Sequence, residues 1–90
     1  MATLKIPTPL RSYTQNKTDL NIEGATIDTV LSQAIELYPG LESQLFDQNN
    51  QLKQYLNIYI NDLNIRDLEN LESNVSNNDV ISIIPAIAGG

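Results

Sequence analysis

Residues 26–40 read TIDTVLSQAIELYPG, and this stretch has the clearest periodicity in the chain. Its apolar residues recur at spacings of three, four, seven and eight, which places them on one face of a helix with about 3.6 residues per turn. Thr26 is a typical N-cap residue, and Pro39-Gly40 is typical of a helix end. The stretch predicts one amphipathic helix whose buried face carries Ile27, Val30, Leu31, Ala34, Ile35 and Tyr38.

Two short segments before the helix alternate apolar and polar residues, as half-buried strands do. They are residues 3–6, which end at Pro7, and residues 20–22, which are followed by Gly24. Residues 7–18 lie between them and are rich in Pro, Gln and Asn, which indicates a loop or an irregular hairpin. The two strands are therefore expected to pair with each other.

The chain after the helix predicts further strands. Residues 41–46 have the spacing of a short second helix, residues 51–60 alternate as a strand, and residues 64–66 suggest a short edge strand. Residues 80–84 form a nearly continuous apolar run, which is typical of a strand buried on both faces in the middle of a sheet. Pro85 is expected to end that strand.

The resulting order, β-β-α-β-(β)-β, predicts an α+β fold. A helix that crosses one face of a mixed sheet, with the last strand beside the first, is the most economical arrangement. This is a β-grasp, or ubiquitin-like, roll. In 90 residues we expect one domain over residues 1–85, followed by a flexible C-terminal tail over residues 86–90.

Composition excludes several classes of function. Five Lys and Arg stand against 11 Asp and Glu, a net charge of −6, which argues against nucleic acid and against anionic membranes as partners. The chain has no Cys and no His, so the usual nucleophile–base pairs and the commonest metal ligands are missing. No apolar run approaches the ~20 residues of a membrane-spanning helix. We expect a cytoplasmic protein without a metal site of its own.

Carboxylates are the remaining candidates for chemistry. Asp67, Glu69 and Glu72 are close in sequence, and the predicted fold brings Asp62 and Asp79 near them. They could bind a cation or act as acid and base. They could equally form a solvated acidic face, or a docking surface for a basic partner.

Two further groups have more than one interpretation. Lys5, Arg11 and Lys17 form a basic cluster with no acid among the first 18 residues, and they could pair with an acidic partner or be ordinary surface charge. Tyr55 and Tyr59 are predicted on the strand face opposite the core. They could be interface aromatics or part of the packing of that face.

The C-terminal residues carry the most informative signal. Glycine gives a chain maximal backbone freedom, so Gly89-Gly90 could enter a narrow channel in another protein, where a Cβ would clash. The group delivered there is the α-carboxylate of Gly90. A carboxylate is a poor electrophile until it is activated, for example by joining it to AMP, after which sulfide, a thiol or an amine can attack. On this interpretation another protein supplies the catalyst, and this chain is not an enzyme.

The closing residues 83–90, which follow the turn at Asn78-Asp79, resemble the MoaD/ThiS family of ubiquitin-like sulfur carriers. Residues 37–41, at the helix end, are also similar. The resemblance covers essentially the whole chain. Within the family it is strongest to carriers of the CysO type, which serve cysteine biosynthesis, on residues 6–11 and on residues 56–66.

This resemblance implies a mechanism. An E1-like adenylyltransferase would use ATP and Mg²⁺ to form an acyl-adenylate at Gly90, and sulfur would replace AMP to give a thiocarboxylate. A pyridoxal-phosphate-dependent (PLP-dependent) cysteine synthase would take the sulfur, and a metalloprotease would release the cysteine. Gly89 has no side chain and would let the tail fit the narrow channel. Ile87 and Ala88 would be the residues of the inserted tail that contact the partner. No cofactor is expected to be bound to this chain itself.

The resemblance leaves other functions open. In the MoaD type, the same tail enters the large subunit of molybdopterin synthase and delivers sulfur to a pterin precursor. Carriers of thiazole synthesis are usually shorter and fit less well. In a protein modifier, Gly90 would instead form an isopeptide bond with a lysine of a target protein.

Overall fold

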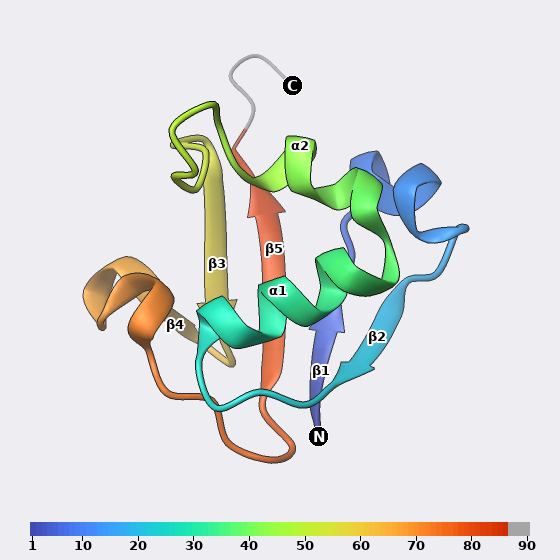
Figure 1. Ribbon diagram of the computed structural model, residues 1–90. Helices are drawn as coiled ribbons and strands as arrows, with labels where there is room; N and C mark the ends of the chain where they lie inside the picture. Colours follow the sequence, from blue (N-terminus) through green and yellow to red (C-terminus); the bar gives the residue numbers. More distant parts are fainter. Residues whose placement is uncertain (87–90) are drawn as a thin grey trace.

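The computed structural model describes residues 1–86 and shows a mixed sheet crossed by one main helix (Figure 1). The sheet order is β2-β1-β5-β3-β4, in which β5 pairs with β1 in parallel and the other neighbours are antiparallel. This is the predicted β-grasp arrangement, with the last strand beside the first. The strands are β1 (Ala2–Lys5), β2 (Asp19–Ile22), β3 (Leu56–Ile60), β4 (Leu63–Asn64) and β5 (Val80–Pro85), and the helices are α1 (Ile27–Leu37) and α2 (Glu42–Leu45).

The predicted helix is confirmed as α1, with the predicted cap. The backbone N–H of Thr29 donates to the Thr26 side-chain oxygen at 3.2 Å, which satisfies one of the free N–H groups at the helix start. The apolar face of α1 packs on the sheet. Its most buried members are Ile27, Val30, Leu31 and Ala34, and Ile35 and Tyr38 are partly buried beside them.

The sheet is covered on one face only within the described residues, so the expectation that β5 is buried on both faces is wrong. Ile81 and Ile83 are buried under the helix, whereas Ser82 is half-buried and Ile84 is 48% exposed. The strand is nevertheless central, because β1 and β3 flank it. The apolar run reflects a central position in the sheet rather than a second covering layer.

Two predicted strands have different limits in the structure. The strand predicted over residues 51–60 begins only at Leu56, because the Lys53 N–H donates to the Leu45 carbonyl at 2.9 Å and Leu52 forms a bridge with Phe46. The edge strand predicted over residues 64–66 is Leu63–Asn64. There the Asn64 side chain accepts the Arg66 N–H at 2.9 Å and starts a 3-10 turn, Ile65–Asp67.

The segment between β1 and β2 is ordered rather than a plain loop. It forms a 3-10 helix, Thr8–Thr14, and Arg11 Nε donates to the Ile6 carbonyl at 3.1 Å. Two further 3-10 turns, Pro39–Leu41 and Asn70–Glu72, connect the main elements. No helix within residues 1–86 has the length and apolar character to cross a membrane.

Replacing Leu31 with alanine tests the packing of α1 on the sheet. Leu31 is fully buried, so Leu31→Ala is expected to lower the free energy of unfolding by about 2–5 kcal/mol in a urea titration. Leu37→Ala in the same helix is the control, because Leu37 is 61% exposed and its loss should change stability by less than about 0.5 kcal/mol. Equal effects of the two substitutions would contradict this packing.

Candidate functional site

The end of β5 fixes the base of the C-terminal tail. Pro85 lies opposite Leu56 of β3, and the Ala86 N–H donates to the Tyr55 carbonyl at 2.6 Å. Because β1 runs parallel to β5, the same edge of the molecule carries the end of β1 and the beginning of β3 (Figure 1). Ala86 is therefore held at this edge, directly after the end of the central strand β5.

The predicted site residues Ile87, Ala88, Gly89 and Gly90 lie outside the described residues. The structure shows that the C-terminal tail starts at Ala86. Four extended residues reach at most about 14 Å, so that length is the upper limit of the distance between Ala86 and Gly90.

The surface beside the tail base is partly apolar. Ile84 is 48% exposed, and Tyr55 is 45% exposed, with the Lys53 ammonium 5.9 Å from the centroid of the Tyr55 ring. Tyr59 differs from Tyr55, because it lies within β3, is half-buried and is opposite Ser82. The structure therefore separates the two tyrosines: Tyr55 precedes the strand and is exposed at the tail base, and Tyr59 packs on the uncovered face of the sheet.

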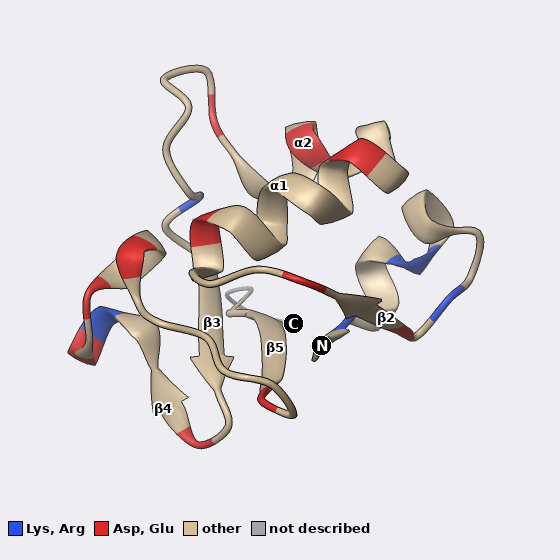
Figure 2. Ribbon diagram, turned by 60° about the horizontal axis from the view of Figure 1, so that its bottom comes forward, with Lys and Arg blue, Asp and Glu red and all other residues tan. Residues whose placement is uncertain are grey.

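The predicted acidic residues do not form a metal site within residues 1–86, where no group of three or more potential ligands converges. They are spread over the turn after β3, the 3-10 turns and the turn before β5 (Figure 2). Asp79 has a structural role, because its carboxylate accepts the Ser76 N–H at 2.8 Å and the Asn61 side-chain amide at 3.1 Å. Asp62, Asp67, Glu69 and Glu72 are exposed.

The predicted basic cluster also divides between different roles. Lys5 Nζ is 3.9 Å from Asp19 Oδ1, and both side chains are about half exposed, so this ion pair contributes little. Arg11 holds the Ile6 carbonyl, as described above, and Lys17 is exposed. The three residues lie around β1, β2 and the segment between them (Figure 2).

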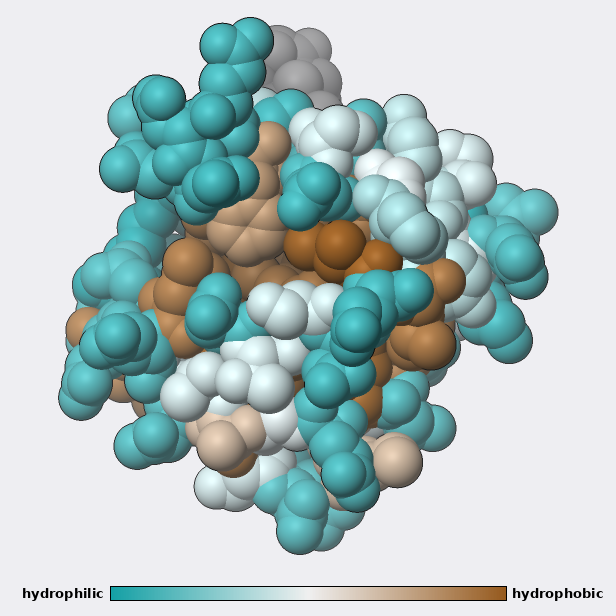
Figure 3. Space-filling view, in the orientation of Figure 1, coloured by the Kyte–Doolittle hydropathy of each residue, from teal (hydrophilic) through white to brown (hydrophobic). Residues whose placement is uncertain are grey.

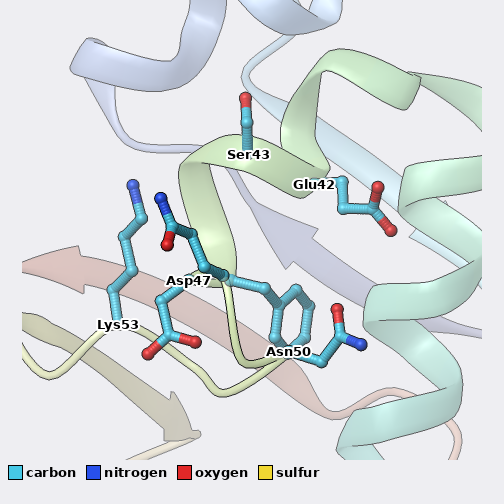
Figure 4. A pocket seen from close by; sticks show the side chains of 7 residues that line it. Glu42, Ser43, Asp47, Asn50 and Lys53 are labelled. Carbon is cyan, nitrogen blue, oxygen red and sulfur yellow. The ribbon is translucent and has the colours of Figure 1, made fainter.

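A hollow of about 540 Å³ lies beside α2. Its labelled side chains point in different directions instead of converging on one point (Figure 4). Asp47 is already engaged, because its Oδ1 accepts the Asn49 N–H at 2.8 Å and the Gln51 N–H at 3.1 Å. This hollow therefore lacks the convergent polar groups of a ligand site.

A second hollow, of about 440 Å³, lies between the segment before β3 and the 3-10 turns after β4. Leu52, Leu56, Ile65 and Leu71 contribute to its apolar lining, and apolar surface is visible in the depression below the segment before β3 (Figure 3). Arg66 lies at this hollow and donates to two backbone carbonyls. Arg66 was predicted within the edge strand over residues 64–66 and among the residues that resemble CysO-type carriers, but no role was predicted for its side chain.

Comparisons with known proteins agree on one family. The ThiS family matches residues 4–90. The sulfur carrier protein CysO of Mycobacterium tuberculosis is 33% identical over 90 residues, covering 98% of this chain and 97% of that protein.

Solved structures of CysO and of a small archaeal modifier protein are also similar to this chain. CysO in its crystal structure with BexX, from Amycolatopsis orientalis, has a TM-score of 0.92, 31% identity and full coverage of both chains. The small archaeal modifier protein 1 of Methanosarcina acetivorans has a TM-score of 0.86 and 30% identity, covering 99% of this chain and 95% of that one.

The structural role of Asp79 can be tested against an exposed acid. Asp79→Ala removes the acceptor for two hydrogen bonds and should lower the free energy of unfolding by about 1–2 kcal/mol in urea. Asp62→Ala is the control and should change it by less than about 0.5 kcal/mol. If both variants were as stable as the parent protein, Asp79 would be another solvated surface acid.

Proposed function

The chain belongs to the ThiS family, and on that premise we propose that it is a sulfur carrier protein of the CysO type. In this proposal Gly90 is adenylylated and then converted to a thiocarboxylate, which donates its sulfur for cysteine biosynthesis. The observation that carries the proposal is the 33% identity to a sulfur carrier protein CysO over 98% of this chain. The family match also extends to residue 90, the proposed reactive residue.

The proposed activation has two steps. The Gly90 carboxylate oxygen attacks the α-phosphorus of ATP, and pyrophosphate leaves. A sulfur nucleophile then attacks the carbonyl carbon, and AMP leaves with the electron pair of the broken carbon–oxygen bond. An E1-like adenylyltransferase supplies the ATP site and Mg²⁺. This chain supplies the carboxylate, the narrow Gly89-Gly90 end, and Ile87 and Ala88 as contacts within the partner's channel.

In this proposal the chain carries the reacting carboxylate and partner enzymes catalyse the reaction, because of the side chains that the chain contains. The chain has no His and no Cys, so it lacks the residues most used as general base and as thiol nucleophile. The hollow beside α2 has no converging polar groups. The carrier therefore acts as a co-substrate, and partner enzymes perform the catalysis.

The proposed acceptor of sulfur is an activated serine derivative. A PLP-dependent cysteine synthase would form the carbon–sulfur bond, leaving cysteine attached to Gly90, and a metalloprotease would release it. The relatives named CysO support this choice. The Amycolatopsis CysO was crystallised in a complex with BexX, which supports the inference that this chain also works by docking on a partner protein.

A protein modifier is the second candidate. It is supported by the likeness to a small archaeal modifier protein, at 30% identity and with a TM-score of 0.86. The chemistry is the same through activation of Gly90, and it differs in the nucleophile, which would be a lysine amine of a target protein.

Extending the chain by one alanine after Gly90 tests the site of activation. The added residue moves the carboxylate and places a Cβ where the channel should admit only glycine. The extended protein is expected to keep its circular dichroism spectrum and its unfolding midpoint but to lose ATP-dependent adenylylation, measured by intact mass with extract of the source cells, ATP and sulfide. Adenylylation of the extended protein without prior trimming would contradict the mechanism.

The fate of the activated carrier distinguishes the two candidates. With the parent protein in the same extract, we expect a mass increase equal to replacement of one oxygen by sulfur, located at Gly90 by fragmentation. Addition of O-phosphoserine or O-acetylserine should then move the mass to that of a cysteine adduct. Higher-mass conjugates without the sulfur-exchanged species would favour the modifier, and stable co-purification with a larger pterin-binding subunit would favour the molybdopterin pathway.

A further inference from the structure

The first residues of β3 have an open edge. On one side β3 pairs with β5, and on the other side β4 is so short that it pairs only with Tyr59 and Ile60. The carbonyls of Gln54 and Leu56 therefore have no strand partner at that edge. Unpaired carbonyls in this position would leave the segment before β3 weakly held.

Arg66 occupies this edge. Its Nη2 donates to the Gln54 carbonyl at 2.7 Å and to the Leu56 carbonyl at 3.1 Å, so one nitrogen bridges two carbonyls on the same side of the chain. Hydrogen bonds from a charged donor are stronger than those from a neutral one. The base of the side chain is fixed as well, because the Arg66 N–H binds the Asn64 side chain and Ile65 is 1% exposed.

The tail base binds the same segment from the opposite side. The Tyr55 carbonyl lies between those of Gln54 and Leu56 in sequence, and it accepts the Ala86 N–H at 2.6 Å. Pro85 lies opposite Leu56. Residues 54–56 are thus held by Arg66 at one edge and by the start of the tail at the other.

The guanidinium is directed at the backbone and not at a carboxylate. Arg66 is followed by Asp67 and lies near Glu69 in sequence, yet Lys5–Asp19 is the ion pair found within residues 1–86. The Arg66 side chain is exposed, and its guanidinium donates to the two backbone carbonyls of Gln54 and Leu56. Its actual contacts are those that immobilise the residues on which Ala86 is anchored.

We propose that Arg66 is a positioning residue for the C-terminal tail. By fixing residues 54–56, it holds the Tyr55 carbonyl in place for Ala86 and so sets the direction in which the chain leaves the sheet. This inference rests on the proposed function, since only activation at Gly90 gives that direction a purpose. When the first residue of the tail, Ala86, is held in place, less conformational entropy is lost on placing the Gly90 carboxylate in a partner's site.

Amide hydrogen exchange measured by NMR tests the contact in the isolated protein. In Arg66→Ala the Ala86 amide should exchange about tenfold faster or more than in the parent protein, while the amides of Ile81 and Ile83 keep their rates. Arg66→Lys should be intermediate. Lys17→Ala removes the same charge at a distant exposed site and should leave Ala86 unchanged. The proposal would be overturned if the Ala86 amide exchanged at the same rate in Arg66→Ala and Lys17→Ala. It would also be overturned if Arg66→Ala accelerated exchange equally at all amides of β5.

Activation kinetics test the consequence. With the partner adenylyltransferase in an ATP–pyrophosphate exchange assay, Arg66→Ala should raise the KM for the carrier about fivefold or more over Lys17→Ala, with kcat within about twofold. Arg66→Lys should recover part of that loss. Equal KM values for the two alanine variants would overturn the positioning role. Failure of the parent protein to be adenylylated would refute the proposed function instead, and the Ala86 exchange would still decide whether Arg66 holds the tail base.

Discussion

The parallel pairing of β1 with β5 is the constraint on which the rest of the structure depends. A parallel pair requires a long crossover connection, and residues between β2 and β5 supply it, with α1 lying across the sheet. The pairing puts the last strand in the centre, with β1 and β3 on either side. The C-terminal residues therefore leave from the best-supported part of the fold, and not from an edge strand.

This arrangement reconciles two requirements that conflict in a small protein. The core must be built without disulfides, because the chain has no Cys, and it is one continuous cluster from the inner face of the sheet and the apolar face of α1. The proposed function requires a chain end that can enter another protein. A central strand ending at Pro85 meets both needs, since the core lies before that residue and the proposed reactive group lies beyond it.

Much of the fold could be predicted from local sequence. The spacing of apolar residues and the Thr26 cap located α1, and Asn78 marked a turn, where it adopts a φ of 72°. The errors arose where tertiary contacts override local pattern. Residues 51–55 alternate like a strand, but the Lys53 N–H donates to the Leu45 carbonyl, and β3 begins only at Leu56. The apolar run of β5 has one face uncovered, which periodicity cannot reveal. Arg66 was missed for a related reason, because its carbonyl partners are 10 and 12 residues away.

The candidate site was predicted both from the side chains that the sequence lacks, His and Cys, and from the Gly89-Gly90 residues that it contains. A chain without His or Cys lacks the residues most used as general base and as thiol nucleophile, and the terminal carboxylate was therefore predicted as the reacting group. A terminal carboxylate has no side chain through which to be oriented, so its placement must come from the backbone that precedes it. In this protein that backbone includes Ala86, whose N–H donates to the Tyr55 carbonyl, and Arg66 holds the opposite side of the segment to which Tyr55 belongs. The physical logic of the proposed carrier is therefore that the sheet orients the start of the tail, the glycines let its end enter a partner, and the partner determines the chemistry.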